Sequence, residues 1–237
     1  MKLKAEKLSW KEEAKRKAAL EAVKHVCEGF AVGLGSGSTV AYAFKEIGKR
    51  IKNEGLQIYG VPTSYQAFML ATKYGIPTTT LDEHPKLDLA IDGADQIDKK
   101  INLIKGMGGA LLREKIVATA AKQLVIVADE SKIANSLGKN QQVPIEVLPF
   151  ASATVVSKIR EMKGKPFLRE GKDKVGPVIT DNGNFIIDVD FGSIENPKEL
   201  ERKLKSIPGI IETGLFIDMA DTAYIGTPTT VKMLKRK

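Results

Sequence analysis

Short apolar runs alternate with helical segments along the first part of this chain, and polar residues follow the apolar runs. Runs of this length, bounded by glycine or polar residues, are typical of buried strands. The alternation therefore predicts an α/β fold with a doubly wound, mainly parallel, Rossmann-like sheet. The predicted strands are residues 30–35, 57–61, 77–81, 87–92 and 123–132, and the predicted helices are residues 10–28, a helix from about 40, 65–74 and 110–122.

The pattern changes after about residue 140. From there the order strand, helix, strand occurs twice, which is typical of a ferredoxin-like α+β unit. We therefore expect a small α+β domain at 140–218 and a larger α/β domain made of 1–139 plus 219–237. The predicted elements of the small domain are strands at 143–150 and 166–170, a helix at 154–162, a hairpin at 178–191 turned at 181–183, a helix at 197–206 and a final strand at 209–217.

In the stretch 91–116, four of the charged side chains stand out because of their places around a group of glycines. Asp92 ends a predicted strand, Asp95 and Lys105 precede the glycines, and Glu114 lies on the helix that follows. Open α/β sheets bind ligands at the carboxyl ends of their strands. This stretch is therefore our first candidate for a functional site.

Glu114 is the strongest candidate for a catalytic residue in this stretch. Its neighbours one helical turn away, Ala110 and Ala118, cannot form a salt bridge with it. A carboxylate among small apolar side chains is partly desolvated, which raises its proton affinity and suits it to acid–base chemistry. The helical position alone also fits an ordinary surface glutamate paired with a distant charge.

The segment 35–39, between a predicted strand and a predicted helix, fits an anion-binding loop. The helix N-terminus offers free N–H groups, and Ser38 and Thr39 add hydroxyl donors. A dinucleotide fingerprint would need Gly or Ala in place of Ser38, and a P-loop would need a lysine after its last glycine. A phosphate cradle therefore remains, beside the alternative of a tight turn without a ligand.

Composition excludes several classes of protein. The chain has 237 residues, 43% hydrophobic and 28% charged, with no apolar run long enough for a membrane span. Its net charge of +8 is spread along the sequence without interleaved aromatic residues, so we expect no nucleic-acid partner. The single cysteine, Cys27, favours a reducing cytoplasm. His25 and His84 lack metal-ligand spacing, so we expect no metal.

Nine segments in this order resemble the type A ribose-5-phosphate isomerases and cover nearly the whole chain. The segments are GLGSGST, GVPTS, DGAD, KGMGGALLREKIVA, VADESK, PIEVLPF, TDNGN, PGIIETGLF and IGTP. The resemblance implies a cofactor-free aldose–ketose isomerase that interconverts ribose 5-phosphate and ribulose 5-phosphate. It also implies a homodimer or homotetramer.

The resemblance assigns a role to several residues. It implies that Glu114 is the base, that Lys105 stabilises a cis-enediolate, and that Asp92 and Asp95 bind the sugar. Where the family often has three consecutive glycines, this chain has Met107 within the run. Its backbone N–H can still be presented, so we expect altered loop packing rather than lost activity. The implied substrate-binding residues are Ser36, Gly37, Ser38, Thr39, Asp92, Gly93, Ala94, Asp95, Lys105, Gly106, Met107, Gly108, Lys132 and, by a looser match, Lys15.

Three other classes of function remain. A sugar-phosphate sensor of similar fold would normally carry a helix-turn-helix module, but only one helix is predicted before residue 30. A CoA transferase would use a glutamate as nucleophile, whereas the candidate phosphate loop and Lys105 favour a sugar phosphate. A structural or RNA-binding role has only the net charge in its favour.

Overall fold

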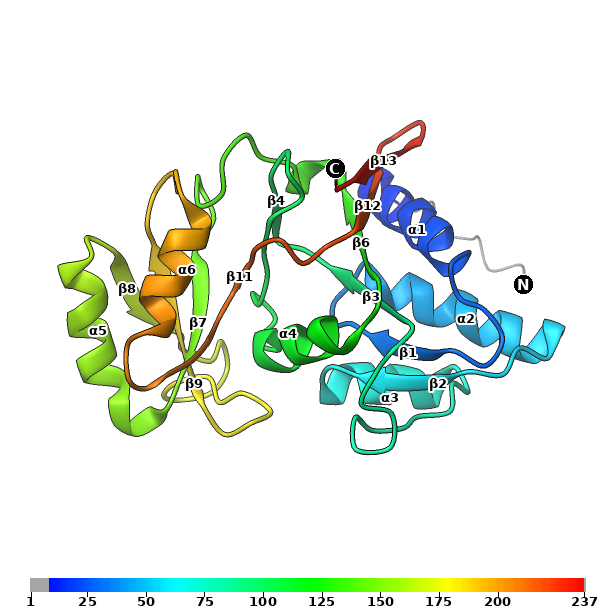
Figure 1. Cartoon of the computed structure of the whole chain (residues 1–237), viewed down its shortest axis with the longest axis horizontal. Coiled ribbons are helices and arrows are strands. Elements are labelled where there is room, and N and C mark those ends of the chain that lie inside the picture. The colour runs from blue at the N-terminus through cyan, green and yellow to red at the C-terminus, as the bar shows by residue number, and fades with distance from the viewer. Residues whose placement is uncertain (1–8, 237) are drawn as a thin grey trace.

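The computed structural model describes residues 9–236. Its main sheet contains β1 (Ala31–Leu34), β2 (Tyr59–Pro62), β3 (Leu89–Gly93), β6 (Leu124–Asp129), β12 (Thr222–Gly226) and β13 (Val231–Lys235). The strands are ordered β13-β12-β6-β3-β1-β2, and all but β13 are parallel (Figure 1). The first parallel strand in the sequence lies between the second and the third, so the chain winds in both directions from β1. The predicted doubly wound sheet is confirmed.

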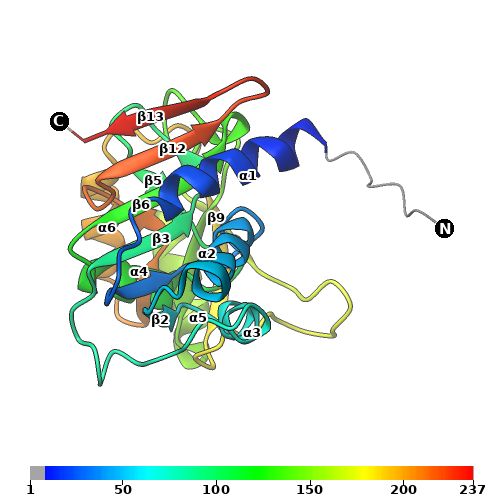
Figure 2. The same cartoon turned by 90° about the vertical axis from the view of Figure 1, so that its right-hand side faces the viewer.

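Helices cover both faces of this sheet. The helices are α1 (Trp10–Val23), α2 (Val40–Glu54), α3 (Tyr65–Lys73) and α4 (Leu111–Ala120). The first three share one apolar core with strand residues such as Val32 and Ile91, and α1 lies along β12 and β6 (Figure 2). The alternate strand residues, such as Ala90, face α4 through Val117 and Ala118. Among residues 9–236, no helix is long and apolar enough to cross a bilayer.

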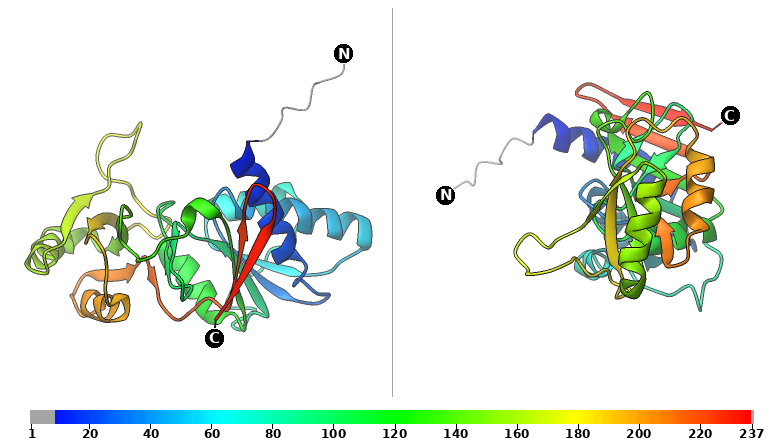
Figure 3. Two further views of the ribbon diagram at one scale, coloured as in Figure 1. Left: turned by 90° about the horizontal axis from the view of Figure 1, so that it is seen from above. Right: turned by 90° about the vertical axis from the view of Figure 1, so that its left-hand side faces the viewer.

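The small domain is an antiparallel sheet with two helices. It contains β7 (Val143–Val147), α5 (Ser152–Glu161), β8 (Lys165–Leu168), β9 (Phe185–Asp190), α6 (Pro197–Lys205) and β10 (Ile210–Thr213). The strand order is β10-β7-β9-β8, and both helices pack on one apolar core with this sheet. The repeated strand–helix–strand order confirms the predicted α+β class. The segment between β8 and β9 extends from the body of this domain (yellow in Figures 2 and 3).

A third sheet, absent from the sequence-based prediction, connects the two parts (Figure 1). It consists of β4 (Gln96–Ile97), β5 (Leu103–Ile104) and β11 (Leu215–Phe216), all antiparallel. The predicted single strand at 209–217 is therefore wrong: Gly214 divides it into β10 and β11, which belong to different sheets. A Cβ at Gly214 would lie 2.3 Å from the Lys105 carbonyl oxygen, so only glycine fits this crossing.

Three other predicted elements differ from the structure. The first helix ends at Val23 rather than at residue 28, because Arg50 on α2 donates to the Val23 and Val26 carbonyls there. The predicted strand 77–81 is reduced to one bridge between Thr78 and Gly60, after which a turn begins. The first arm of the predicted hairpin at 178–191 forms only one isolated bridge, from Ile179 to Phe185, and β9 pairs with β7 and β8 instead.

Short 3₁₀ turns replace the ends of two predicted strands. The turn Glu130–Lys132 follows β6, and the turn Pro149–Ala151 follows β7. In the first, the Asp129 carboxylate accepts from the Ser131 N–H at 3.0 Å, so a side chain stops the strand by satisfying the backbone.

The close packing of α1 on β12 generates a stability prediction. A Cβ at Gly226 would lie 2.0 Å from the Ala14 carbonyl oxygen, and backbone cannot move away as a flexible side chain can. Gly226→Ala should therefore lower the free energy of unfolding by roughly 1–3 kcal/mol, as overpacking does in other cores. Denaturant unfolding measures this change. Gly108→Ala, which adds a methyl group into open space, is the matched control. Equal midpoints for the two variants would contradict the argument.

Candidate active site

The strand order brings two loops together at one edge of the main sheet. Strands β1 and β3 are neighbours, but the chain leaves them toward opposite faces, into α2 and α4 respectively. Open α/β sheets bind ligands at such a switch point. A cavity of about 490 Å³ lies there. Its lining includes Lys15, residues 36–39, Ser64, Gln66, residues 93–95, Lys105, Gly106, residues 108–110, Glu114, Lys132 and residues 178–181.

A buried ammonium group lies at the bottom of the site. Lys105 Nζ is 3.0 Å from Asp92 Oδ2 and 3.3 Å from Glu114 Oε2, and it donates to the Gly93 carbonyl at 2.7 Å. The exposed fractions of the Lys105, Asp92 and Glu114 side chains are only 3%, 4% and 6%. One cation therefore serves two carboxylates away from solvent. Among residues 9–236, no group donates a hydrogen bond to Glu114 Oε2.

Burial shifts all three ionisations. On Glu114 burial is the largest effect and repulsion from Asp92 the next, and they raise its pKa to about 8 against the attraction of Lys105. Burial likewise raises the pKa of Asp92. Burial alone would lower the pKa of Lys105, but the carboxylates of Asp92, Glu114 and Asp95 outweigh it and raise that pKa above the ordinary 10.5. The lysine thus stays charged, and the carboxylate pair holds one proton near neutral pH.

Asp92 lies beneath the cavity rather than in its wall. Its Oδ1 accepts from the N–H groups of Gly93 at 2.7 Å and Ser36 at 3.3 Å. A Cβ at Gly35 would lie 2.2 Å from the same oxygen. Glycine at 35 is therefore what allows the loop after β1 to close over the carboxylate.

The loop at 36–39 carries the donors that an anion needs. Ser36 Oγ lies 2.8 Å from Thr63 Oγ1 and 2.6 Å from Ser64 Oγ. The Thr39 side chain does not cap α2, and the first N–H groups of any α-helix lack partners within the helix. Lys15 Nζ, from α1, donates to Ser38 Oγ at 3.1 Å. A positive charge therefore accompanies hydroxyl and amide donors at this end of the cavity.

The glycine loop after Lys105 is fastened from two sides. The Met107 N–H donates to Asp95 Oδ2 at 2.9 Å, and Arg169 donates to the carbonyls of Gly106 and Met107 at 3.2 and 2.9 Å. Arg169 is itself held by an ion pair with Asp188 on β9. In this structure the Met107 N–H thus holds the Asp95 carboxylate. The loop packing around the extra side chain is set by Arg169.

The sequence matches the ribose 5-phosphate isomerase A (phosphoriboisomerase A) family over residues 59–230. It is 54% identical over 224 residues to the ribose-5-phosphate isomerase A of Methanosarcina acetivorans, covering 94% of each chain. The chain belongs to the ribose 5-phosphate isomerase A family. The family structure from Methanocaldococcus jannaschii aligns with a TM-score of 0.91 at 46% identity, covering 94% of this chain and 99% of that one. A D-ribose-5-phosphate isomerase in complex with phospho-erythronic acid aligns with a TM-score of 0.93 at 45% identity, covering 95% and 99%.

The structure brings nearly all the predicted site residues of this isomerase-family chain to one cavity. Every predicted residue except Asp92 and Met107 lines it, including Lys15 and Lys132. Sequence reasoning missed Ser64 and Gln66, although Thr63 and Ser64 follow a predicted strand as the other site residues do. It also missed residues 178–181 of the small domain, although Thr180 and Asp181 belong to the segment TDNGN, one of the nine that carry the family resemblance. Residues 9–236 hold no cluster of His, Cys, Asp and Glu suited to a metal ion.

The raised pKa of Glu114 predicts a pH-dependent stability. The folded pKa of about 8 lies above the ordinary 4.5, so the folded state keeps a proton that the unfolded chain loses between these values. Glu114 therefore makes the protein less stable as the pH rises from about 4.5 through 8. Glu114→Gln removes this effect, and its Tm advantage over wild type should grow between pH 5 and pH 9.

Thermal unfolding at several pH values measures this advantage. Glu161→Gln is the control, because that side chain is 60% exposed and, within the described range 9–236, pairs only with Lys158 on its own helix. Its Tm difference from wild type should stay constant over the same range. A Glu114→Gln advantage that shrinks as the pH rises would contradict the assigned pKa.

Proposed function

We propose that this protein interconverts D-ribose 5-phosphate and D-ribulose 5-phosphate by proton transfer through a cis-enediolate. The observation that carries the proposal is the Glu114 carboxylate, with a pKa raised to about 8, lying 3.3 Å from the buried Lys105 ammonium at the wall of a cavity. A base of that strength beside a fixed positive charge is what abstraction of a proton next to a carbonyl requires.

The two ends of the substrate meet different chemistry in the cavity. The phosphate is bound by residues 36–39 at the start of α2, with Lys15 as a counter-charge. The sugar carbons then extend toward Lys105 and Glu114, and Asp95 and Lys132 bind hydroxyl groups along the way. The family resemblance implies that these residues bind the substrate, and their common cavity supports that assignment.

Proton transfer needs one base, because the exchanging carbons are adjacent. Ionised Glu114 takes the proton from C2 of the open-chain aldose, and the electron pair moves onto the C1 carbonyl oxygen. The cis-enediolate has both oxygens on one side, so the Lys105 ammonium stabilises both. After the remaining hydroxyl proton moves from O2 to O1, Glu114 returns its proton to C1 and the ketose forms. Asp92 holds Lys105 in place at 3.0 Å.

Other parts of the proposal rest on sequence and composition. We propose that the chain acts without a cofactor, that it is a homodimer or homotetramer, and that it is located in the cytoplasm without membrane or nucleic-acid partners. The small domain is proposed to span residues 140–218.

Turnover of ribose 5-phosphate in the presence of EDTA tests this function. Wild type should convert it to ribulose 5-phosphate, and Glu114→Gln should lose roughly a hundredfold or more, because a carboxamide cannot accept the proton. Glu161→Gln should match wild type. A folded wild type that binds the sugar phosphate without turning it over would identify a sensor instead. Undiminished turnover by Glu114→Gln would remove this residue from the mechanism.

The pH dependence of kcat/KM provides a second test. Only ionised Glu114 can act as the base, and its pKa is about 8, so kcat/KM should rise with pH and level off above that value. The raised pKa of Lys105 predicts no loss of activity below its ordinary 10.5. An activity that falls as the pH rises through 8 would show that the protonated form is the active one.

A further inference from the structure

The residues on either side of Glu114 both bind the small domain. Consecutive helical residues are about 100° apart around the axis, so the side chains of Arg113 and Lys115 leave α4 on opposite sides of the Glu114 side chain. Arg113 contacts the turn at residues 180–184, and Lys115 contacts α6 and β10. The helical turn that carries Glu114 is thus held at two points by one domain.

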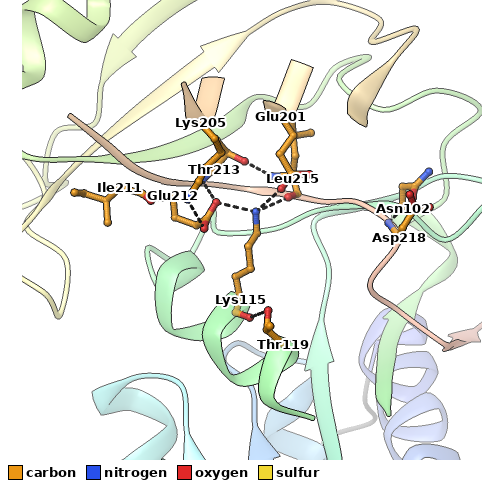
Figure 4. A network of polar contacts seen from close by, with 10 residues as sticks. All are labelled: Asn102, Lys115, Thr119, Glu201, Lys205, Ile211, Glu212, Thr213, Leu215 and Asp218. Carbon is orange, nitrogen blue, oxygen red and sulfur yellow. Dashed lines mark hydrogen bonds and ion pairs between the residues drawn. The ribbon is translucent and has the colours of Figure 1, made fainter. Parts of the chain in front are cut away.

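Lys115 uses all its donors in a nearly buried network (Figure 4). Its Nζ donates to Glu201 Oε1 at 2.8 Å, to Glu212 Oε1 at 3.0 Å and to the Leu215 carbonyl at 2.6 Å. An ammonium group has three hydrogens, so its capacity is filled. Lys205 pairs with the other Glu212 oxygen at 2.9 Å. The two lysines of the network therefore balance the charges of its two glutamates. The network therefore fixes the Lys115 side chain in one position.

Phe216 links this network to the catalytic lysine. The ammonium groups of Lys105 and Lys115 lie 5.4 and 4.9 Å from the centroid of its ring. Both distances are within the range of cation–π attraction. A displacement of Lys115 would therefore remove a neighbour of the ring that also packs against Lys105.

Arg113 makes the contact on the opposite side. Its guanidinium donates to Asn182 Oδ1 at 2.7 Å and to the Asp181 carbonyl at 2.8 Å. The Asp181 carboxylate in turn accepts from the Tyr65 N–H, at the start of α3, at 2.8 Å. This turn also lines the cavity through Thr180 and Asp181.

A buried carboxylate of the small domain holds the turn itself. Oε1 of Glu146, a fully buried residue on β7, accepts from Thr180 Oγ1 at 2.8 Å, Asn182 Nδ2 at 3.0 Å and Asn184 Nδ2 at 2.8 Å. The support that Arg113 reaches is therefore itself rigid.

Lys105 and Glu114 are thus held by different parts of the protein. Lys105 is fixed by Asp92 and by the Gly93 carbonyl, both on β3 of the main sheet. Glu114 Oε2 has no hydrogen-bond partner among residues 9–236 and meets Lys105 only as an ion pair at 3.3 Å, so the placement of its helix sets the distance between the two groups. We propose that Arg113 and Lys115 are positioning residues that hold the base Glu114 at the distance from Lys105 that proton transfer requires. This proposal rests on the proposed isomerase function.

Lys115→Met tests the proposal, because it keeps the aliphatic stem and removes the three donors. A misplacement of about 1 Å can cost about a hundredfold, so kcat should fall by roughly tenfold to a hundredfold while KM stays within about threefold of wild type. Lys115→Arg, which can still bind both glutamates, should recover part of the loss. Lys122→Met, just beyond α4 in an exposed ion pair with Asp88, is the matched control and should keep wild-type kinetics.

Arg113→Gln covers the case in which Lys115→Met does not fold, because Arg113 is only half-buried and its loss leaves no buried charge. It should lower kcat in the same way. A folded Lys115→Met or, failing that, a folded Arg113→Gln with kcat within about twofold of wild type would overturn the proposal.

A carboxyl NMR titration separates this proposal from the proposed function. In ¹³C-labelled protein, the Glu114 carboxyl signal is assigned as the one that is present in the wild-type spectrum and missing from the spectrum of Glu114→Gln. A displaced helix admits water, so the pKa of Glu114 should move in the folded variant from about 8 toward its ordinary 4.5. If wild type shows no turnover, the isomerase function fails and the titration alone decides whether these residues position Glu114. An unchanged titration in that case would overturn the positioning role.

Discussion

The burial of Lys105 between two carboxylates is the constraint on which the rest of the structure depends. Removing one cation and two potential anions from water is costly, and the attraction between them offsets that cost only when the geometry is tight. The Gly93 carbonyl adds a hydrogen bond of 2.7 Å to the ammonium. The cost that is not offset is expressed as the raised pKa of Glu114, to which burial contributes most and the second carboxylate, Asp92, contributes next. The site gains a strong base first because Glu114 is buried and second because Asp92 repels its negative charge.

Two glycines without side chains make this cluster possible. Gly35 lets the loop after β1 close over Asp92, and Gly214 lets the chain that leaves the small domain cross directly over the Lys105 backbone, where the Lys105 N–H donates to the Gly214 carbonyl at 2.9 Å. The first approach comes from the main sheet and the second from the junction of β10 and β11. The lysine is therefore enclosed by segments that are far apart in the sequence.

The sequence alone identified those site residues that lie close together along the chain. Asp92, Lys105 and Glu114 lie within one stretch, and the expectation that apolar neighbours raise the proton affinity of Glu114 agrees with its pKa in the folded protein. The third sheet could not be predicted, because strands of two residues have no periodicity and β11 lies more than a hundred residues beyond β5. The end of α1 depends on Arg50, and the glycine loop on Arg169; both act through the tertiary fold. Local patterns carry no information on such partners.

The same free energy acts on stability and on basicity. The free-energy cost of ionising Glu114 in the folded protein makes this carboxylate a stronger base. The same cost is relieved when water reaches the carboxylate, so it also favours any movement of α4 that would let water in. The helix must therefore be held in place against the burial cost and the repulsion from Asp92 that together raise the pKa of Glu114. Arg113 and Lys115, bound to the small domain on either side of Glu114, oppose that movement. A second domain beside the main sheet is thus understandable as the support that a buried, strongly basic carboxylate requires.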